Sequence, residues 1–294
     1  MTNVSCATLG HYGRLGNQMF QLAATVGLSK RWGGRWGYPH RNNIERSRIS
    51  MYGETCILPN IFPSVEKANA WDDSWLDTGY CMGYAEPQDD LAQSFIVPTI
   101  TKPTNVHGTP IDTLNIHGYF QSEEFFANAK DEVRNLFRFS DEVLDGAQEI
   151  LDKTPGLIDH VGIHVRRGDY LKIKAVLPPL GWNYFWRAIR EWGDYSKFAI
   201  FGCVDAESRA WALDTFVEKG YPVEFVGSVA GDPDIRSGID MCLFSMLRGG
   251  KIISNSSFAW WGAWLGEGHC PKIVAPDTWF GPAGPKNNRL VPER

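Results

Sequence analysis

Two adjacent arginines directly follow a short apolar run in the middle of the chain. The run Val161 to Val165 has the length and composition of a buried strand, and residues 164–169 read H-V-R-R-G-D. A guanidinium can hold a phosphate through two parallel hydrogen bonds. We therefore expect Arg166 and Arg167 to bind a phosphorylated ligand and to stabilise charge that grows on a departing phosphate. An ordinary surface Arg-Asp turn is the alternative interpretation.

Hydroxyl and amide side chains follow a second apolar run. Residues 254–262 read S-N-S-S-F-A-W-W-G, and they lead from an expected strand into an expected helix. The first backbone N–H groups of a helix have no partner within the helix and attract anions. Asn255, Ser256 and Ser257 are therefore candidates for binding the same phosphate. Simple capping of the helix by Ser256 explains the same pattern.

A glycine loop opens another expected helix near the N-terminus. Residues 13–18 read G-R-L-G-N-Q, which lacks both the G-x-G-x-x-G spacing of a dinucleotide site and the Lys-Ser/Thr ending of a P-loop. Arg14, Gly16 and Asn17 are candidate ligand contacts in this loop. A plain strand-to-helix turn fits equally well.

The elements that must position these residues alternate between strand and helix, most regularly in the second half of the chain. Apolar strands that alternate with helices favour an α/β fold with parallel sheets covered on both faces. Residues 154–156 read T-P-G and end a helix, so we expect two domains, 1–156 and 157–294. The expected strands are Val4 to Leu9, Asn115 to Phe120, Val161 to Val165, Lys197 to Cys203, Val223 to Val226, Lys251 to Ser254 and Lys272 to Ala275. The expected helices are Asn17 to Arg31, Ser122 to Phe137, Ser140 to Leu151, Asp205 to Val217, Ile235 to Arg248 and Ser256 to Leu265.

Composition and charge narrow the class of protein. A net charge of −5 argues against a nucleic-acid partner, because binding to a phosphate backbone needs a positive field. Met1 to Ala7 does not resemble a signal peptide, and no apolar run is long enough to span a membrane. The six cysteines are scattered, which indicates free thiols in a reducing compartment. We expect a cytoplasmic protein without membrane insertion; the sequence does not define the oligomeric state.

Together, five ordered motifs resemble the α-1,2-fucosyltransferase family, an inverting, GDP-fucose-dependent, family 11-like group of enzymes. The family shows a G-x-L-G-N-Q-M-F loop, a G-Y-F-Q-S-E segment, H-x-R-R-G-D, N-S-S-F-x-W-W-G-A-W-L and a late A-P with W-F. In this chain the motifs start at residues 13, 118, 164, 255 and 275, so the resemblance spans most of the chain.

The resemblance implies a GT-B-like α/β fold in which two Rossmann-like halves face each other across a cleft. It implies that the C-terminal half binds GDP-β-L-fucose, with Arg166 on the β-phosphate, His164 near the guanine or ribose and Asp240 on the guanine edge. The acceptor would enter from the N-terminal half, near residues 13–18 and 118–123. The residues assigned to these sites are Arg14, Gly16, Asn17, His164, Arg166, Arg167, Asp240, Asn255, Ser256 and Ser257.

Two regions depart from the family pattern. Many members carry F-S-D-D after the strand that follows the arginines, whereas residues 201–205 here read F-G-C-V-D. A variable region, in which we expect acceptor preference to be set, includes Trp32, Trp36 and the stretch from Trp71 to Trp75. Nucleotide contacts near Asp205 and the exact acceptor therefore stay open.

Asp232 and Asp234 form a D-x-D pair, which in metal-dependent glycosyltransferases ligates Mn²⁺ and so balances the diphosphate charge. Here Gly231 and Pro233 place the pair in a turn before a helix. We interpret the pair as a helix cap and expect neither a metal nor another cofactor.

The resemblance predicts a galactoside α-1,2-fucosyltransferase that uses GDP-fucose and a galactose-terminated oligosaccharide. Inversion at the anomeric carbon needs a stabilised leaving diphosphate, assigned to Arg166, and a base near the acceptor hydroxyl. Asp169 is the candidate base, although orienting Arg167 is its expected role. The alternatives are a fucosyltransferase with another acceptor, such as a protein hydroxyl or an inner sugar, and a non-catalytic carbohydrate-binding protein.

Overall fold

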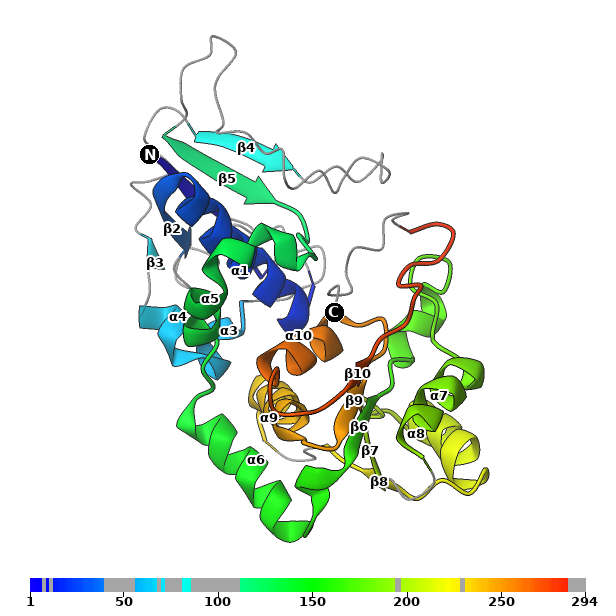
Figure 1. Ribbon diagram of the computed structural model, residues 1–294. Helices are drawn as coiled ribbons and strands as arrows, with labels where there is room; N and C mark the ends of the chain where they lie inside the picture. Colours follow the sequence, from blue (N-terminus) through cyan, green and yellow to red (C-terminus); the bar gives the residue numbers. More distant parts are fainter. Residues whose placement is uncertain are drawn as a thin grey trace. The chain divides into compact units, whose positions relative to one another are not determined.

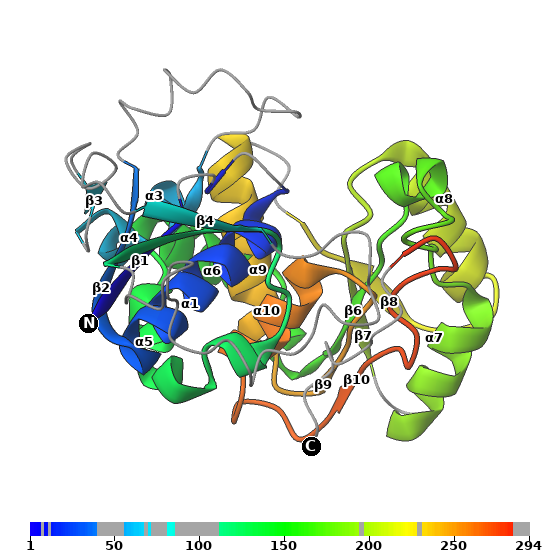
Figure 2. The same ribbon diagram turned by 90° about the horizontal axis from the view of Figure 1, so that it is seen from above.

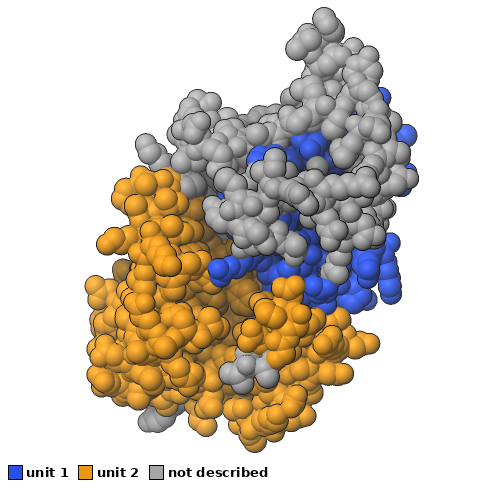
Figure 3. Space-filling view, turned by 180° about the vertical axis from the view of Figure 1, so that it is seen from behind, with its two compact units in different colours: residues 1–138, 292–294 blue, residues 139–291 orange. Residues whose placement is uncertain are grey.

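The structure is a computed structural model that describes residues 1–6, 9–10, 13–39, 56–67, 70–71, 81–85, 112–193, 197–227 and 231–284. For residues 39, 70–71 and 81–85 only the backbone is described. The chain divides into two compact units, Met1–Arg138 with Pro292–Arg294, and Phe139–Val291 (Figure 3).

The first unit contains a five-stranded sheet in the order β3-β2-β1-β5-β4 (Figure 1). All its strand pairs are parallel. From β1 the sheet continues through β2 and β3 on one side, whereas the later strands β5 and β4 lie on the other side. The strand order therefore reverses between β1 and β5. The strands are β1 (Thr2–Ser5), β2 (Gly33–Pro39), β3 (Ala70–Trp71), β4 (Cys81–Ala85) and β5 (Thr113–His117).

Helix α1 (Leu15–Arg31) packs on β1 and β2, and it is buried along nearly its whole length. A Cβ atom at Gly27 would lie 2.2 Å from the Phe125 carbonyl oxygen, so only glycine allows the close approach of α1 to the segment after β5. Shorter helices complete the unit. They are α3 (Leu58–Ile61), α4 (Pro63–Lys67), α5 (Lys130–Leu136) and the 3₁₀ turns η3 (Glu123–Phe125) and η4 (Ala127–Ala129).

The second unit contains a five-stranded parallel sheet in the order β10-β9-β6-β7-β8. The chain runs outward from β6 to β7 and β8, and then crosses to β9 on the other side of β6. The strand order therefore reverses between β6 and β9. The strands are β6 (Val161–His164), β7 (Phe198–Phe201), β8 (Val223–Phe225), β9 (Gly250–Ile252) and β10 (Ile273–Val274).

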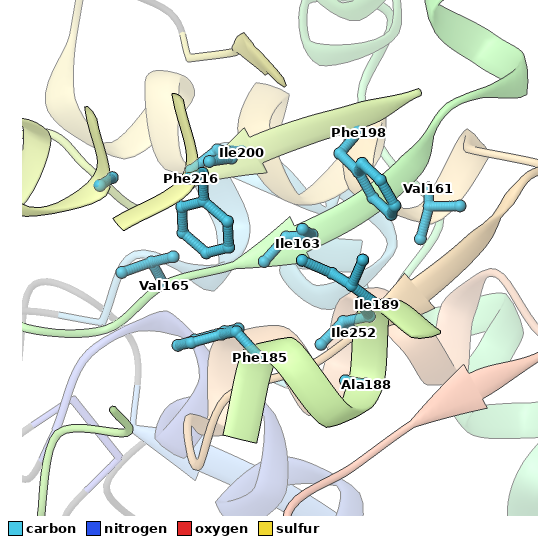
Figure 4. Packing of buried hydrophobic residues seen from close by; sticks show 11 residues of the cluster. Val161, Ile163, Val165, Phe185, Ala188, Ile189, Phe198, Ile200, Phe216 and Ile252 are labelled. Atoms are coloured by element: carbon cyan, nitrogen blue, oxygen red, sulfur yellow. The ribbon is translucent and has the colours of Figure 1, made fainter. Parts of the chain in front are cut away.

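Side chains that alternate along β6 separate the two faces of this sheet. Val161, Ile163 and Val165 belong to a core that includes Phe185 of α7 (Trp182–Ile189) and Phe216 (Figure 4). On the other face, a Cβ at Gly162 would lie 2.8 Å from Phe244 of α9 (Pro233–Met246). His164 points to this second face, because alternate residues of a strand share a side. Figure 2 shows α7 and α9 on opposite sides of the sheet.

The remaining helical elements of the second unit are brief apart from α6 and α10. They are α6 (Asp141–Lys153), η5 (Leu157–Asp159), η6 (Gly168–Lys172), η7 (Arg190–Trp192), α8 (Ala206–Ala212), the π-helical turn η8 (Leu213–Val217) and α10 (Ser257–Leu265). Ser140 caps α6, as expected from the sequence, and Asp205 caps α8.

The division between the units lies at residues 138 and 139, earlier than the boundary expected near residue 156. The reason is the packing of α6, which precedes that expected boundary. Gly146 of α6 lies against Ile239 of α9, where a Cβ atom would come within 2.4 Å of the isoleucine side chain. Helix α6 is therefore part of the second unit.

Among the described residues, no helix combines the length and the apolar character needed to cross a membrane. Cys203, Cys242 and Cys270 in the second unit are free thiols.

Candidate active site

The two motifs expected to bind a phosphate follow the two strands at which the second sheet reverses its order. Parallel strands end at the same edge of a sheet, and ligands of open α/β sheets bind beyond the carboxyl ends at this reversal. His164 is the last residue of β6 and the R-R-G-D residues come after it, whereas Ser254 and Asn255 follow β9. His164 Nδ1 lies 2.7 Å from Ser254 Oγ, so a side-chain contact joins the two motifs directly.

His164 lies inside this frame. Its side chain is 2% exposed, and its ring lies against Phe258 and Phe244, with centroid distances of 5.4 and 6.3 Å. Burial, with a smaller contribution from the Arg166 cation, lowers the pKa of His164 to about 3. The imidazole is therefore neutral, and its contacts are those of a residue that connects β6 with β9 and α10.

Arg166 is held by two neighbours. Its Nη2 atom donates to Asp169 Oδ2 at 2.8 Å, and its guanidinium carbon lies 5.2 Å from the centre of the Tyr170 ring. The buried Nε atom has no hydrogen-bond partner among the described residues. We expected Asp169 to orient Arg167, and this was wrong. Asp169 lies three positions after Arg166 at the start of the short turn η6, so its carboxylate reaches Arg166 instead.

Arg167 turns toward α8. Its guanidinium carbon lies 4.3 Å from the centre of the Trp211 ring, a cation–π distance. The backbone beside it is fixed by a small network, in which Gly168 N donates to Ser208 Oγ at 3.3 Å and Ser208 Oγ donates to Asp205 Oδ2 at 2.7 Å. The hydrogen bond from the Ser208 side chain lowers the pKa of Asp205. The capping carboxylate of α8 therefore supports the arginine loop.

Asn255 connects the start of α10 with three other segments of the second unit. Its side chain is fully buried, and Nδ2 donates to the carbonyl oxygens of Pro178 and Trp279 at 2.9 and 3.0 Å. Its own carbonyl oxygen accepts a hydrogen bond from the Tyr170 hydroxyl at 3.0 Å. Such contacts make Asn255 a residue that holds the start of α10 in place. Its Oδ1 atom is buried without a hydrogen-bond partner among the described residues.

The start of α10 is open in the sense that the side chain of its N-cap residue does not cap it. Ser256 occupies the N-cap position, but its side chain accepts no capping hydrogen bond from the described part of the helix, so simple capping does not account for it. Ser256 is buried and Ser257 is half-buried. The amide groups of this first turn carry the partial positive charge of a helix start.

Asp240 and the D-x-D pair lie on α9. The Asp240 carboxylate faces Gly227, the second residue after β8, where a Cβ would lie 3.8 Å from Oδ2. Asp232 Oδ1 accepts from Asp234 N at 2.8 Å, so the expected helix cap is confirmed. In the parts of the chain that the structure describes, no three His, Cys, Asp or Glu side chains are grouped to hold a metal ion.

In the first unit, two motifs meet at the reversal of the first sheet. The glycine loop comes after β1 and the G-Y-F-Q-S-E segment directly follows β5. Gln121 Nε2 donates to Asn17 Oδ1 at 2.6 Å, and Gln21 Nε2 donates to the Gly118 carbonyl oxygen at 3.1 Å. Arg14 is exposed at the N-cap of α1 and Gly16 is buried.

Backbone conformation shapes both motifs of the first unit. Gly13 has φ of 77°, and a Cβ there would collide with the Asn17 side chain at 2.2 Å. Phe120 has φ of 49°, which is unusual for a bulky residue, and its side chain is fully buried. The chain therefore turns sharply at Phe120, just before Gln121. Such strain is common at functional sites.

Three residues of the second unit contribute to the site without being singled out from the sequence. Tyr170, Ser208 and Trp211 contact the two arginines or the loop that carries them. Tyr170 directly follows the R-R-G-D residues, and this position is the one available signal. Nothing in the local pattern of α8 distinguishes Trp211 from a core tryptophan. Of the variable tryptophan region, residues 72–75 lie outside the described residues.

Comparisons with known proteins identify the family to which the chain belongs. The family model described as Glycosyl transferase family 11 matches residues 101–283. An O-antigen biosynthesis glycosyltransferase of Escherichia coli, WbnK, is 29% identical over 60% of this chain and 58% of its own length. An alpha-1,2-colitosyltransferase of Escherichia coli is 27% identical over 91% of this chain and 90% of its own. Mouse galactoside alpha-(1,2)-fucosyltransferase 1 is 25% identical, covering 91% of this chain and 66% of its own.

Solved structures share the fold at low identity. The fucosyltransferase NodZ from Bradyrhizobium superposes with a TM-score of 0.55 at 16% identity, over 94% of this chain and 96% of its own. POFUT1 in complex with GDP gives 0.52 at 8% identity, over 92% of this chain and 97% of its own. The expected GT-B-like α/β fold is thereby confirmed. Because the family model covers more than half of the sequence, the chain belongs to glycosyl transferase family 11.

Proposed function

We propose that this glycosyltransferase moves L-fucose from GDP-β-L-fucose to the 2-hydroxyl of a terminal galactose. The observation that carries the proposal is the meeting of two motifs at the reversal of the second sheet. Arg166 follows β6, the open start of α10 follows β9, and the contact between His164 and Ser254 holds the two loops together. One cation and one helix start at a sheet edge suit a diphosphate.

In this proposal Arg166 and the start of α10 stabilise the departing GDP. As the bond to the anomeric carbon breaks, negative charge grows on the β-phosphate, and fixed positive groups there stabilise the transition state more than the bound donor. The β-linked donor gives an α-linked product by a single inverting displacement. Arg167 and Ser257 are assigned to the same diphosphate, and Asp240 to the guanine edge.

The acceptor is assigned to the first unit. The amide side chains of Asn17 and Gln121, joined at 2.6 Å, are neutral donors and acceptors of the kind that bind sugar hydroxyls. Gly16 and the exposed Arg14 stand beside them. The chain spans only 58% of the length of WbnK and 66% of that of the mouse enzyme. The galactose acceptor is therefore a proposal, supported by the amide side chains of Asn17 and Gln121 and by the galactoside named for the mouse enzyme.

We further propose that no metal is required. The Asp232 carboxylate already caps α9, and Arg166 with the α10 amides supplies positive charge for the diphosphate. Turnover should therefore persist in excess EDTA. Loss of activity that Mn²⁺ restores would contradict this part of the proposal.

The test of the whole proposal is incubation with GDP-fucose and, separately, lactose, N-acetyllactosamine and lacto-N-biose. Linkage analysis should find α-1,2-linked fucose on galactose in at least one product. Fucose on an inner sugar, or transfer only to a protein hydroxyl, would replace the acceptor assignment. Calorimetry with GDP is the companion measurement, because a non-catalytic carbohydrate-binding protein has no reason to bind GDP.

A second candidate donor is favoured by one comparison. The alpha-1,2-colitosyltransferase matches across 90% of its length, the fullest coverage among the relatives named above. Colitose is the 3-deoxy counterpart of fucose, so GDP-colitose would place the same leaving group on the same residues. Direct competition between GDP-fucose and GDP-colitose decides: a kcat/KM that favours GDP-colitose would change the donor and keep the site.

A further inference from the structure

Tyr170 joins the two loops of the second sheet through both ends of its side chain. The centre of its ring lies 5.2 Å from the guanidinium carbon of Arg166, and its hydroxyl donates to the Asn255 carbonyl oxygen at 3.0 Å. The side chain is 8% exposed. One buried residue thus reaches from the arginine loop after β6 to the residue just before the N-cap of α10.

Arg166 has limited freedom in this setting. Asp169 accepts from its Nη2 atom at 2.8 Å, and the Tyr170 ring contacts the guanidinium. The side chain is 25% exposed, which leaves part of it open to a ligand. An arginine that moved freely would lose conformational entropy on gripping a phosphate, and a preformed arrangement removes much of that cost.

We propose that Tyr170 is a positioning residue for the transfer reaction, fixing the Arg166 guanidinium relative to the start of α10. Tyr170 contacts no substrate in this scheme and acts through Arg166. The inference rests on the proposed function. The inference states that the Tyr170 side chain sets the distance between the Arg166 guanidinium and the first amides of α10, because it contacts both Arg166 and Asn255.

Two substitutions separate the ring from the hydroxyl. Y170F keeps the ring under Arg166 and removes the bond to Asn255, so kcat should fall about threefold, the size of one hydrogen bond. Y170L removes both contacts, and kcat should fall about tenfold or more. The KM for GDP-fucose should change less than twofold in both, because the effect is on the charge that develops in the transition state.

Tyr184 supplies a matched control. Its hydroxyl lies 2.6 Å from the carbonyl oxygen of Ile253, in the segment that precedes α10, and 3.3 Å from that of Val274. Among the described residues it makes no hydrogen bond or cation–π contact with Arg166. Y184F therefore removes only the hydroxyl and its hydrogen bonds, and Y184L removes the ring as well. Assayed well below their unfolding midpoints, both should keep kcat within twofold of the parent enzyme.

A double-mutant cycle with R166A gives the decisive readout. If Tyr170 acts through Arg166, adding Y170L to R166A should change kcat less than twofold. An undiminished tenfold loss in the R166A background, or an equal loss in Y184L, would overturn the inference. If Y170L does not fold, Y170F alone in both backgrounds provides the same comparison.

The outcomes distinguish this inference from the proposed function. A parent enzyme that transfers no sugar from GDP-fucose or GDP-colitose contradicts the proposed function. R166A with undiminished kcat contradicts the role of Arg166. Additive effects of Y170L and R166A, in an active enzyme that needs Arg166, contradict only the role of Tyr170.

Discussion

The two units of the chain use the same sheet plan and place different chemistry on it. Each sheet is parallel, and each has a central pair, β1 with β5 and β6 with β9, at which the strand order reverses. Each pair delivers two family motifs to the same edge. In the first unit amide side chains join the motifs, whereas in the second unit a buried imidazole joins them and arginines follow. Topology fixes where a ligand binds, and side-chain type decides which ligand.

This difference predicts that the first unit binds the acceptor and the second unit binds the donor. Neutral amides in the first unit suit the hydroxyls of an uncharged sugar, and cations with an open helix start in the second unit suit a diphosphate. Substitutions in the second unit should therefore change turnover, donor binding or the stability of its frame. Those in the first unit should change acceptor binding alone.

The largest effect is expected for R166A. Without the guanidinium, charge on the leaving diphosphate loses its main partner, and kcat should fall by roughly two to three powers of ten, the scale found for lost oxyanion donors. Single-turnover kinetics with GDP-fucose would measure it. A matched control is Arg187→Ala, which removes an exposed arginine bonded only to its own helix among the described contacts. Near-parent turnover in R166A would contradict the assignment of the leaving diphosphate to the second unit.

Substitution of His164 tests whether the residues that hold β6, β9 and α10 together differ from the residues that bind the donor. The folded-state pKa of about 3 lies below the ordinary value of 6.5, so at acid pH the unfolded chain takes up a proton that the folded chain refuses. Stability is therefore retained above pH 6.5 and lost as pH falls toward 3. Between pH 7.5 and 5.0 the parent's unfolding equilibrium should shift by about thirtyfold more than that of H164Q.

Denaturant titrations at the two pH values measure this shift, since carboxylates common to both proteins cancel in the comparison. The affinity for GDP at pH 7.5 should stay within a few-fold of the parent in H164Q. An unchanged pH dependence would mean that His164 is solvated in the folded protein. A large loss of GDP affinity in H164Q without a loss of stability would show that His164 contacts the nucleotide.

The second unit was largely predictable from the sequence, because its strands are apolar runs bounded by turns. The expected strand at Val161 to Val165 is β6, and the helix expected from Ser256 is α10, each within a residue or two. Helix α7 was missed although Phe185, Ala188 and Ile189 have helical spacing and are buried. The partner of Asp169 was also predicted wrongly, because spacing alone does not give the direction of a side chain.

The first unit was harder, because its elements depend on contacts distant in sequence. Strand β2 reads G-G-R-W-G-Y-P, and its glycines indicate a helix stop. A Cβ at Gly34 would lie 1.8 Å from the Thr2 carbonyl oxygen, so glycine is required there by the neighbouring strand. The apolar run at residues 57–62 contains the short helix α3 rather than a strand. The meeting of Asn17 with Gln121 could be anticipated only from the family resemblance.

Gln121 tests the assignment of the acceptor to the first unit. Q121A removes the donor to Asn17 Oδ1 and should raise the KM for the acceptor about tenfold, the upper range of one hydrogen bond. The affinity for GDP should not change. The control is Q148A, in which the lost bond goes to Asp152 on the exposed face of α6. Weaker GDP binding in Q121A, measured by calorimetry, would show that the units do not divide donor from acceptor.

The smallest effect is expected for D169N, which asks whether the second unit also supplies the catalytic base. Asn keeps an oxygen for Arg166 Nη2 and loses the charge, so kcat should fall only about fivefold. The acid limb of the pH–rate profile should be preserved, because in this view Asp169 positions Arg166 and moves no proton. D232N, which weakens a carboxylate cap on α9, is the matched control and should change kcat less than twofold.

A loss of more than about a hundredfold in D169N, together with disappearance of that limb, would identify Asp169 as the base. The H-x-R-R-G-D loop of the second unit would then both stabilise the leaving diphosphate and deprotonate the attacking hydroxyl. The first unit would only bind the acceptor. With the expected fivefold loss, the search for a base moves to the groups that follow β1 and β5. There the two joined side chains, Asn17 and Gln121, are amides, and the Glu123 carboxylate pairs with Lys130 at 2.7 Å. If none of them takes the proton, the acceptor hydroxyl would lose it late in a displacement driven mainly by departure of the diphosphate.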